Sequence, residues 1–487
     1  MDSSPAALPL PTFPSPMRTI ESLPGPRRWP LVGNVLQIRP LRLHQDVEAW
    51  CRQYGDFFQM YMGPEQALVV ADHEAVAQVL KQRPDTFRRP ALSERIMREM
   101  GCVPGLFDAE GQDWRNQRRM VMQAFSPQAI KAYFPSLVKV ALRLQARWDG
   151  AAREGRAIVL SDDLKRYTVD IIAGLAFGTD VDTINGGEEV IQRHLDVILP
   201  AIARRTLSVV AYWRVFKLPQ DRRLEQSVVA VKHAIGDLIG QARARLAQDP
   251  ERAAHPANLL EAMLVAAAQP GSGVDDQAVV GNVMIMLLAG EDTTANSIAW
   301  LLYQLQRNPQ ALARARDEVL QFAPDPAAFT IEQMDQLEYL NACIQESMRI
   351  KPVAPFLPVE SMHDTSVAGI HVPAHTLVWC VLRHHSMADS HVPQAAQFDP
   401  QRWLHDGAGA IDRKVAMPFG AGPRTCPGRY LALLEMKAAM AMLLARYDIE
   451  AVQTPDGLEA EELMAFVMSP IGLTMRLRRR GGENGSH

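Results

Sequence analysis

The sequence predicts a mainly α-helical domain with small β-sheets, in the α+β class. Apolar residues recur with helical spacing over most of the chain, and short β-like runs gather near its two ends. Helical and β-like segments do not alternate as they do in βαβ proteins, so a doubly wound dinucleotide-binding fold is disfavoured. The glycines at 420, 422 and 428 also miss the G-x-G-x-x-G spacing of such folds.

Six segments carry apolar residues at the 3.6-residue period that places them on one helix face. They are Leu43–Tyr54, Trp114–Ala124, Ile130–Ala152, Val229–Leu246, Asp276–Arg307 and Ile331–Ile350. A further helix is expected from Arg429 onward, because the residues that follow are strong helix formers such as Leu, Glu, Met, Lys and Ala.

Strands are expected where short runs are rich in β-branched, aromatic and other apolar residues. These runs are "FFQMYMG" (57–63), "ALVVAD" (67–72), "VAGIHVP" (367–373) and "TLVWCVL" (376–382), with another near "GLTMRLR" (472–478).

Composition favours a globular protein. The 487 residues are 47% hydrophobic with a formal charge of −4, a balance that disfavours disorder and a nucleic-acid partner. The Pro- and Ser-rich N-terminus lacks the pattern of a secretory signal, and no run approaches the roughly 20 apolar residues of a spanning helix. We therefore expect a cytoplasmic protein without a membrane anchor: a flexible tail over 1–18, one domain over 19–480 and a second tail over 481–487.

One cysteine stands apart from the other four. The five cysteines are odd in number, widely spaced and without a C-x-x-C pair, which disfavours a disulfide framework or a zinc site. Cys51, Cys102, Cys343 and Cys380 are interpreted as small buried hydrophobic residues. Cys426 lies in "FGAGPRTCPGRYLALLEM" (419–436), where Gly and Pro fix an irregular loop just before a helix.

A helix N-terminus favours anions and so lowers the pKa of a nearby thiol. Three roles for the Cys426 loop follow from its residues alone: a nucleophile for acyl transfer, a structural turn, or an axial thiolate ligand to haem iron. Two alternative functions stay open for a protein with such a loop: a non-catalytic haem-thiolate sensor and a cysteine-nucleophile hydrolase.

The loop matches the pattern F-x-x-G-x-R-x-C-x-G at Phe419, Gly422, Arg424, Cys426 and Gly428, and here the chain resembles the cytochrome P450 family of haem-thiolate monooxygenases. The resemblance covers nearly the whole chain from residue 23. It implies the P450 fold, with haem b between a long distal helix and the Cys-loop helix, and Cys426 as the iron ligand. It also implies cofactor contacts from the rest of the loop: Pro418, Phe419, Gly420, Arg424 and Gly428.

A second motif, "AGEDTTANS" (289–297), places acidic residues and vicinal threonines in the middle of an otherwise apolar helix. Such a local conflict often marks function, although a satisfied polar pocket is the alternative. By the resemblance, Ala289 and Gly290 line the distal side of the haem, where Gly290 leaves room for dioxygen. Asp292 and Thr293 would be the catalytic acid–alcohol pair that organises protons.

Two further motifs match the family. In "ESMR" (346–349), Glu346 and Arg349 share one helix face, and the resemblance pairs them with Arg402 of "FDPQRW" (398–403) in a structural role below the haem. Gln401 stands where the family more often has Glu.

In "WRNQR" (114–118), Trp114 and Arg118 would donate to one haem propionate. The basic residue expected for the other propionate is replaced by Pro358, so that His363 is a possible substitute.

Three apolar wall segments are expected around the substrate. Helix geometry counted back from Thr293 brings Ala289, Met286 and Ile285 to the haem-facing side. The opposite wall would come from Ala354, Phe356 and Leu357, and the C-terminal turn would add Phe466, Val467 and Met468. These side chains predict a mid-sized, mostly apolar substrate.

The sequence therefore predicts a monooxygenase, an oxidoreductase that inserts one atom of dioxygen into an organic molecule by hydroxylation or epoxidation. Since the chain ends soon after Cys426, we expect no fused reductase domain and a separate ferredoxin- or flavodoxin-type electron donor with its reductase. Six basic residues near the motifs would form the docking face of that donor: Arg115, Arg119, Arg413, Lys414, Arg429 and Lys437.

Overall fold

The computed structural model describes residues 18–186, 190–206, 208, 210–404 and 411–481. The tails predicted over 1–18 and 481–487 lie outside these ranges apart from Arg18 and Gly481, so the predicted domain bounds stay a prediction. Helices dominate the described chain and small sheets accompany them, which confirms the predicted fold class.

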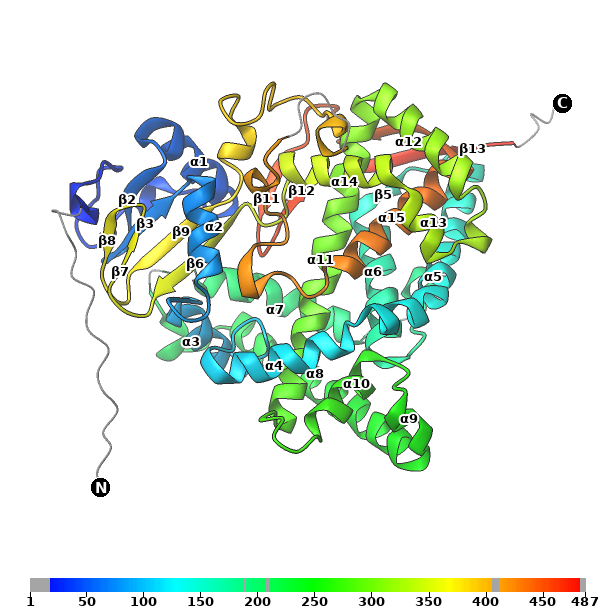
Figure 1. Ribbon diagram of the computed structural model, residues 1–487, viewed down its shortest axis with the longest axis horizontal. Coiled ribbons are helices and arrows are strands. Elements are labelled where there is room, and N and C mark those ends of the chain that lie inside the picture. The colour runs from blue at the N-terminus through cyan, green and yellow to red at the C-terminus, as the bar shows by residue number, and fades with distance from the viewer. Residues whose placement is uncertain (1–17, 187–189, 207, 209, 405–410, 482–487) are drawn as a thin grey trace.

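The long helix α11 (Asp276–Arg307) runs through the middle of the molecule (Figure 1). Asp275 begins it by accepting the N–H of Ala278 at 2.8 Å. The other helices are α1 (Leu43–Tyr54), α2 (His73–Lys81), α3 (Ala91–Glu99), α4 (Gly111–Ala124), α5 (Pro127–Glu154), α6 (Leu160–Phe177), α7 (Val190–Thr206), α8 (Pro219–Gln248), α9 (Pro250–Ala254), α10 (Leu259–Ala267), α12 (Pro309–Phe322), α13 (Ile331–Gln336), α14 (Glu338–Ile350) and α15 (Arg429–Arg446).

The largest described sheet lies to one side of the helices (Figure 1) and has the order β2-β3-β9-β6-β4. Its strands are β2 (Phe57–Met62), β3 (Glu65–Val70), β9 (Leu377–Val381), β6 (Phe356–Ser361) and β4 (Phe87–Arg88). β3 and β9 are parallel, whereas the other neighbours are antiparallel. The sheet thus joins the N-terminal part of the chain to residues that follow α14.

Three smaller sheets are described besides it. One has the order β1-β8-β7, a second β10-β13-β5, and β11 pairs with β12. Their bounds are β1 (Arg18–Thr19), β5 (Ile158–Val159), β7 (Thr365–Val367), β8 (Ile370–Val372), β10 (Tyr447–Gln453), β11 (Glu462–Met464), β12 (Met468–Pro470) and β13 (Thr474–Arg479).

Two predicted elements are divided in the structure. The helix predicted over Ile331–Ile350 is two helices, because Leu337 leaves the helical region at φ −79°, ψ 70°. The strand predicted over 367–373 is part of the β7–β8 hairpin, because Ala368 and Gly369 have positive φ and turn the chain. In both cases a short backbone irregularity interrupts a continuous apolar pattern.

Side chains from α5, α6, α11, α14 and α15 build the main apolar core, in which Trp148 and Trp300 are fully buried. Two smaller apolar clusters cover the two faces of the large sheet, one of them packed with α1 and the other with α2. Within the described residues, no helix has the length and apolar character needed to cross a membrane.

Candidate active site

The loop before α15 holds Cys426 through its own backbone and through α2. The N–H of Cys426 donates to the carbonyl oxygen of Phe419 at 3.0 Å. Gly422 has φ +70°, and a Cβ there would lie 2.5 Å from the carbonyl oxygen of Leu80 in α2. Only glycine fits this close approach, so α2 and the loop are positioned together.

The Cys426 thiol is accessible although protein atoms surround it. Burial raises its pKa, while the N–H groups of Gly428 and Arg429 and the guanidinium group of Arg118 act in the opposite direction. A thiolate in this position has two backbone donors and a nearby cation, yet burial still disfavours its charge. The surroundings fit a sulfur that becomes anionic when a metal ion binds it.

The middle of α11 offers an accessible face. Ala289 is exposed, whereas Leu288 and Met286 beside it are buried. The Thr293 hydroxyl donates to the carbonyl oxygen of Ala289 at 2.7 Å, one turn back. Since α11 passes through the middle of the molecule (Figure 1), Ala289 and Thr293 are accessible residues on a central helix.

Gly290 lies on the side of α11 that faces α6. A Cβ at this position would lie 2.6 Å from both Cδ1 and Cγ1 of Ile172 in α6. The small residue therefore permits the close crossing of α11 and α6. This packing gives a second reason for a small residue here, and the expectation that Gly290 leaves room for dioxygen stays a prediction.

Asp292 is paired across the same helix crossing. The Nζ atom of Lys165 in α6 lies 2.8 Å from Asp292 Oδ1 and 3.9 Å from Glu291 Oε1. Burial alone would lower the Lys165 pKa, but the two carboxylates raise it above its ordinary value. The carboxylate of Asp292 is thus held by a charged lysine, and sequence motifs gave no indication of that partner.

Three of the predicted anion donors lie close together at the start of α4. The guanidinium group of Arg424 lies 4.8 Å from the ring centroid of Trp114. Its Nη2 donates to the carbonyl oxygen of Ala109 at 2.6 Å and to Glu110, while its buried Nε has no hydrogen-bond partner among the described residues. In the same ranges, the Trp114 indole N–H and the Arg118 side chain have no acceptor either. The group retains donors for an added anion.

A buried arginine outside the motifs joins this group. Arg83 is 3% exposed, and its Nε and Nη2 have no hydrogen-bond partner in the described part of the chain. The Arg83 pKa is lowered to about 9, chiefly by burial and in part by Arg89, while Glu110 acts in the opposite direction. An unpaired buried cation is unfavourable unless an anion accompanies it.

Arg83 replaces His363 as the candidate for the second propionate. His363 is exposed in the turn after β6, whereas Arg83 lies near Glu110 and Arg424. Pro358 has β-sheet pairing opposite Trp379 and offers no donor. The accessible Cys426 thiol and these unpaired donors fit a haem with its two propionate groups.

Glu346, Arg349 and Arg402 lie together, as the motifs predict. Arg349 forms two hydrogen bonds with Glu346, Nε to Oε2 at 2.8 Å and Nη2 to Oε1 at 2.7 Å, and both side chains are fully buried. Arg402 Nε lies 3.4 Å from Glu346 Oε1, and Trp403 donates to Glu346 at 2.8 Å. Arg349 also lines a small cavity together with Pro418, which links this cluster to the Cys426 loop.

The predicted substrate walls approach one another. The N–H of Met468 donates to the carbonyl oxygen of Val353 at 2.8 Å, so the C-terminal turn lies against the segment that begins β6. The Phe466 ring lies 6.5 Å from that of Phe107, centroid to centroid. Val467 is buried, whereas Phe356 stacks on Trp379 at 4.9 Å. Phe107 is a candidate wall residue that the sequence analysis missed, because no motif contains it.

The loop that carries Phe107 also covers the first half of α11. A Cβ on Gly105 would lie 2.9 Å from Ile285 Cγ1, and the neighbouring Met286 is buried. Ala354 is half-buried beyond the end of α14. The guanidinium group of Arg89 lies 3.4 Å from the Phe107 ring centroid, which brings a cation to the edge of this apolar region.

A buried acid lies behind the Thr pair of α11. Burial raises the pKa of Glu435, in α15, from its ordinary value of 4.5 to about 8, and the Thr294 hydroxyl acts against this shift. Glu435 Oε1 has no hydrogen-bond partner among the described residues. Burial therefore favours the neutral carboxylic acid form of this side chain at neutral pH.

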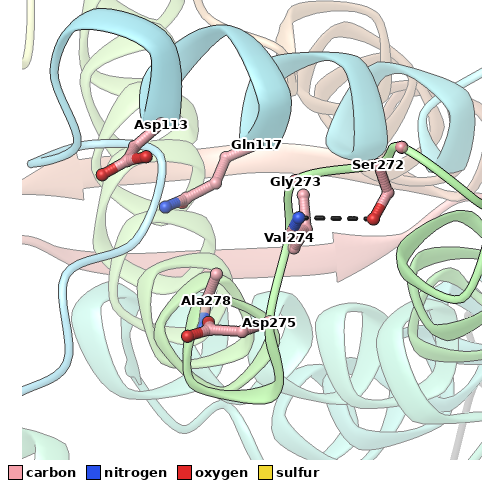
Figure 2. A pocket seen from close by; sticks show the side chains of 8 residues that line it. Asp113, Gln117, Ser272, Gly273, Val274, Asp275 and Ala278 are labelled. Carbon is pink, nitrogen blue, oxygen red and sulfur yellow. Dashed lines mark hydrogen bonds between the residues drawn. The ribbon is translucent and has the colours of Figure 1, made fainter.

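A separate hollow opens at the beginning of α11 (Figure 2). It lies between α4 and the loop before α11, and its lining includes Asp113, Gln117, Val274 and Asp275. Two of its polar side chains already have partners, since Asp275 caps α11 and Gln117 accepts from Asn282 at 2.8 Å.

Comparisons agree with this geometry. A family model described as "Cytochrome P450" matches residues 23–476. The crystal structure of the cytochrome P450DA heme domain superposes with a TM-score of 0.80, covering 94% of this chain and 98% of that chain at 23% identity. This likeness shows the fold.

The curated relatives are identical to this chain at about one residue in four. Cyclooctat-9-en-7-ol 5-monooxygenase of Streptomyces melanosporofaciens is 27% identical over 88% of this chain and 89% of its own length. The chloroplastic protein LUTEIN DEFICIENT 5 of Arabidopsis thaliana is 27% identical over 82% and 68%, respectively.

The self-sufficient cytochrome P450 monooxygenase CYP505E4 of Penicillium expansum is 27% identical over 96% of this chain, which spans 44% of that relative. Self-sufficient relatives carry their reductase in the same chain, and this overturns the expectation of a separate ferredoxin- or flavodoxin-type donor.

The predicted docking face for that donor also fails at Lys437, which is buried and donates to the carbonyl oxygen of Met334 at 2.8 Å.

Proposed function

The chain belongs to the cytochrome P450 family, and on that premise we propose that it inserts one oxygen atom into a mid-sized, mostly apolar organic molecule by hydroxylation or epoxidation. It is a haem-thiolate monooxygenase whose cofactor is haem b with a cysteine thiolate as axial ligand. The cytoplasmic location expected from the sequence stays a prediction.

Cys426 is the proposed ligand, and the observation that carries this assignment is its accessible thiol beside two backbone N–H groups and Arg118. Bound haem supplies the activation of dioxygen, which the electron-rich thiolate promotes. Trp114 and Arg118 would hold one propionate, and Arg83 with the free Nε of Arg424 would hold the other. The buried Glu346–Arg349–Arg402 cluster would keep the loop below the cofactor rigid.

On the opposite side, Thr293 and Asp292 would handle protons. The Thr293 hydroxyl lies on the accessible face of α11 and bonds only its own helix among the described residues, so it can reorient toward a bound molecule. Asp292 would exchange protons after leaving Lys165. A positioned acid of this kind typically contributes about 10²- to 10⁴-fold to a rate.

The apolar substrate is supported by the wall residues Ile285, Phe107, Phe466 and Val467. Lys and Arg are absent from the three predicted wall segments, so a buried anionic group next to the cofactor would lack a partner. The relative from Streptomyces melanosporofaciens is named for an alcohol substrate, cyclooctat-9-en-7-ol, which agrees in kind with a mostly apolar pocket.

The reduced carbon monoxide difference spectrum tests the ligand. The natural protein should give the thiolate-type band, Cys426→His should lose it, and Cys102→Ala should keep it because Cys102 is a buried packing residue. A thiolate-type band in Cys426→His would contradict the assignment.

A titration that follows displacement of the iron's water ligand tests the pocket. Neutral terpenoid or long-chain alcohols should give the optical shift, and multiply charged compounds of similar size should not. Phe466→Ala should weaken binding of the alcohols about tenfold, because it removes apolar contact area. The matched variant Leu458→Ala, at an exposed position, should leave affinity unchanged. Binding of charged compounds alone would contradict the proposal.

A further inference from the structure

Three histidines from separate parts of the fold meet at the beginning of α2. His73 is the first residue of α2, His385 begins the short 3-10 turn His385–Met387, and His391 lies in the turn that follows. Their side chains differ in burial: His385 is 4% exposed, His73 is half-buried and His391 is exposed. The proposed monooxygenase chemistry gives no role to any of them.

The ring nitrogens are close enough to share one ion. His73 Nδ1 and His385 Nδ1 lie 2.9 Å apart, and one ligand atom from each histidine falls within 4.8 Å of the other two. Two nitrogens at about 2.0–2.1 Å from a tetrahedral ion are roughly 3.4 Å apart. His73 and His385 need to separate slightly, and the exposed His391 ring needs to turn inward.

Asp56 orients the central ring. Its Oδ1 lies 2.8 Å from His385 Nε2, and a carboxylate can only accept, so the neutral His385 ring carries its proton on Nε2. The lone pair of Nδ1 then faces His73. A carboxylate on the far nitrogen of a ligating histidine is the usual arrangement around protein-bound zinc.

An ordinary hydrogen-bond network explains two of the rings but not the third. A proton shared between His73 and His385 accounts for the 2.9 Å contact. The His391 ring stacks on His385 with centroids 3.9 Å apart and an angle of 19°, and it has no hydrogen-bond partner in the described ranges. A free imidazole held against two others is a third potential ligand.

We propose that His73, His385 and His391 bind one divalent ion of the zinc, nickel or cobalt type, with Asp56 as the orienting carboxylate. Imidazole nitrogen suits these ions and does not suit magnesium or calcium. Binding moves the proton that His73 Nδ1 shares with His385 to His73 Nε2, so both rings stay neutral and the metal takes the place of the shared proton. The fourth position falls to water or to Asp72, whose Oδ2 lies 4.0 Å from His385 Nδ1.

The location gives the ion a structural role. Asp72 already caps α2 by accepting the Ala75 N–H at 2.7 Å, and α2 contacts the Cys426 loop through Leu80 and Gly422. On the other side, Arg349 donates to the carbonyl oxygen of Ser386, next to His385, at 2.5 Å. An ion here would fasten α2 to the turn that Arg349 supports.

The test is calorimetric titration of zinc into the untagged, chelator-treated holoprotein, with nickel, magnesium and calcium in parallel. We expect the protein to bind one equivalent of zinc or of nickel and to bind neither magnesium nor calcium. His391→Ala, at an exposed position, should weaken zinc binding at least tenfold. Asp56→Asn should weaken it about 10- to 100-fold.

His384→Ala is the matched control. Asp56, His384 and His385 form a second possible ligand group on the other side of the His385 ring. Under the proposal, His384→Ala binds zinc as the natural protein does. Zinc should also raise the thermal midpoint of the natural protein and not that of His391→Ala, with the haem spectrum unchanged in both.

Three results would overturn the site: no stoichiometric zinc, equal zinc affinity in the natural protein and His391→Ala, or loss of zinc in His384→Ala instead. Each readout is metal binding or stability, so failure of the site leaves the monooxygenase proposal untouched.

Discussion

Lys165 Nζ lies 2.8 Å from Asp292 Oδ1, and this ion pair joins α6 to the middle of α11. Asp292 is mostly buried and Lys165 is about one-third exposed. The acid proposed for proton transfer is therefore held toward α6. Transfer to Thr293 requires Asp292 to leave its lysine, so the two residues make separable contributions to turnover.

Asp292→Asn should lower turnover by roughly 100-fold, because it removes the carboxylate that can take up and release a proton. Lys165→Met should change turnover less than about fivefold, because a partly exposed ion pair contributes only about 0.2–1 kcal/mol. Steady-state product formation measures both, with the exposed Asp162→Asn in α6 as control. Equal losses in Asp292→Asn and Lys165→Met would mean that the intact pair, not the acid, is required.

Thr293→Ala should divert oxygen to peroxide, because the hydroxyl that helps to deliver protons is gone. The product formed per reducing equivalent should fall severalfold while oxygen consumption continues. Thr293→Ser keeps a hydroxyl at the same place and should retain most of the coupling. If Thr293→Ala stays fully coupled, the alcohol is not part of the proton path.

Arg83→Met should act in opposite directions on the apoprotein and the holoprotein. Removing an unpaired buried charge should leave the apoprotein as stable or more stable. Losing a charge-assisted hydrogen bond to a propionate should speed haem loss about tenfold or more. Transfer of haem to excess apomyoglobin measures the rate, and Arg95→Met, at an exposed position, is the control. Unchanged haem loss would remove Arg83 from the propionate site.

Glu435→Gln should alter how stability depends on pH. Burial raises the pKa of Glu435 from 4.5 to about 8, so between these values the unfolded chain has released a proton that the folded protein keeps. The stabilising contribution of this group is complete below pH 4.5, falls as pH rises, and is lost above pH 8, a total change on the order of 5 kcal/mol.

Glutamine cannot ionise, so the stability of Glu435→Gln relative to the natural protein should be higher at pH 9 than at pH 5.5. Thermal midpoints at the two pH values should show a relative gain of several degrees at the alkaline one. Glu459→Gln, at an exposed position, should show no such difference. A gain that is independent of pH would mean that Glu435 is not titrating in this range.

Helices with long, regular apolar spacing could be predicted closely. The bounds of α1 and α11 agree with the prediction, and the N-cap Asp275 is a readable start for α11. The prediction omitted α6, because most of its residues are buried on every side and no polar face reveals its period. It also omitted α12, although Asn308 and Pro309 give an ordinary helix start.

The residues of the candidate site likewise fall into those that the sequence could identify and those that it could not. Short motifs single out Cys426, Thr293 and Glu346, because fixed spacings along the chain identify them. Lys165 and Arg83 lie in no motif, and their importance comes from tertiary contacts with Asp292 and with the region around Glu110. No pattern in a single sequence brings such distant residues together.

The parallel pairing of β3 with β9 sets an order of events during synthesis. Ala67 pairs with Leu377, so the apolar strand β3 leaves the ribosome roughly 300 residues before its neighbour. At a synthesis rate of about 5–20 residues per second, this strand edge stays unpaired for on the order of 15–60 s. An open apolar edge of that kind invites association with other chains. Expression of this protein should therefore depend on chaperones that occupy nascent N-terminal segments, and fragments that end before β9 should aggregate.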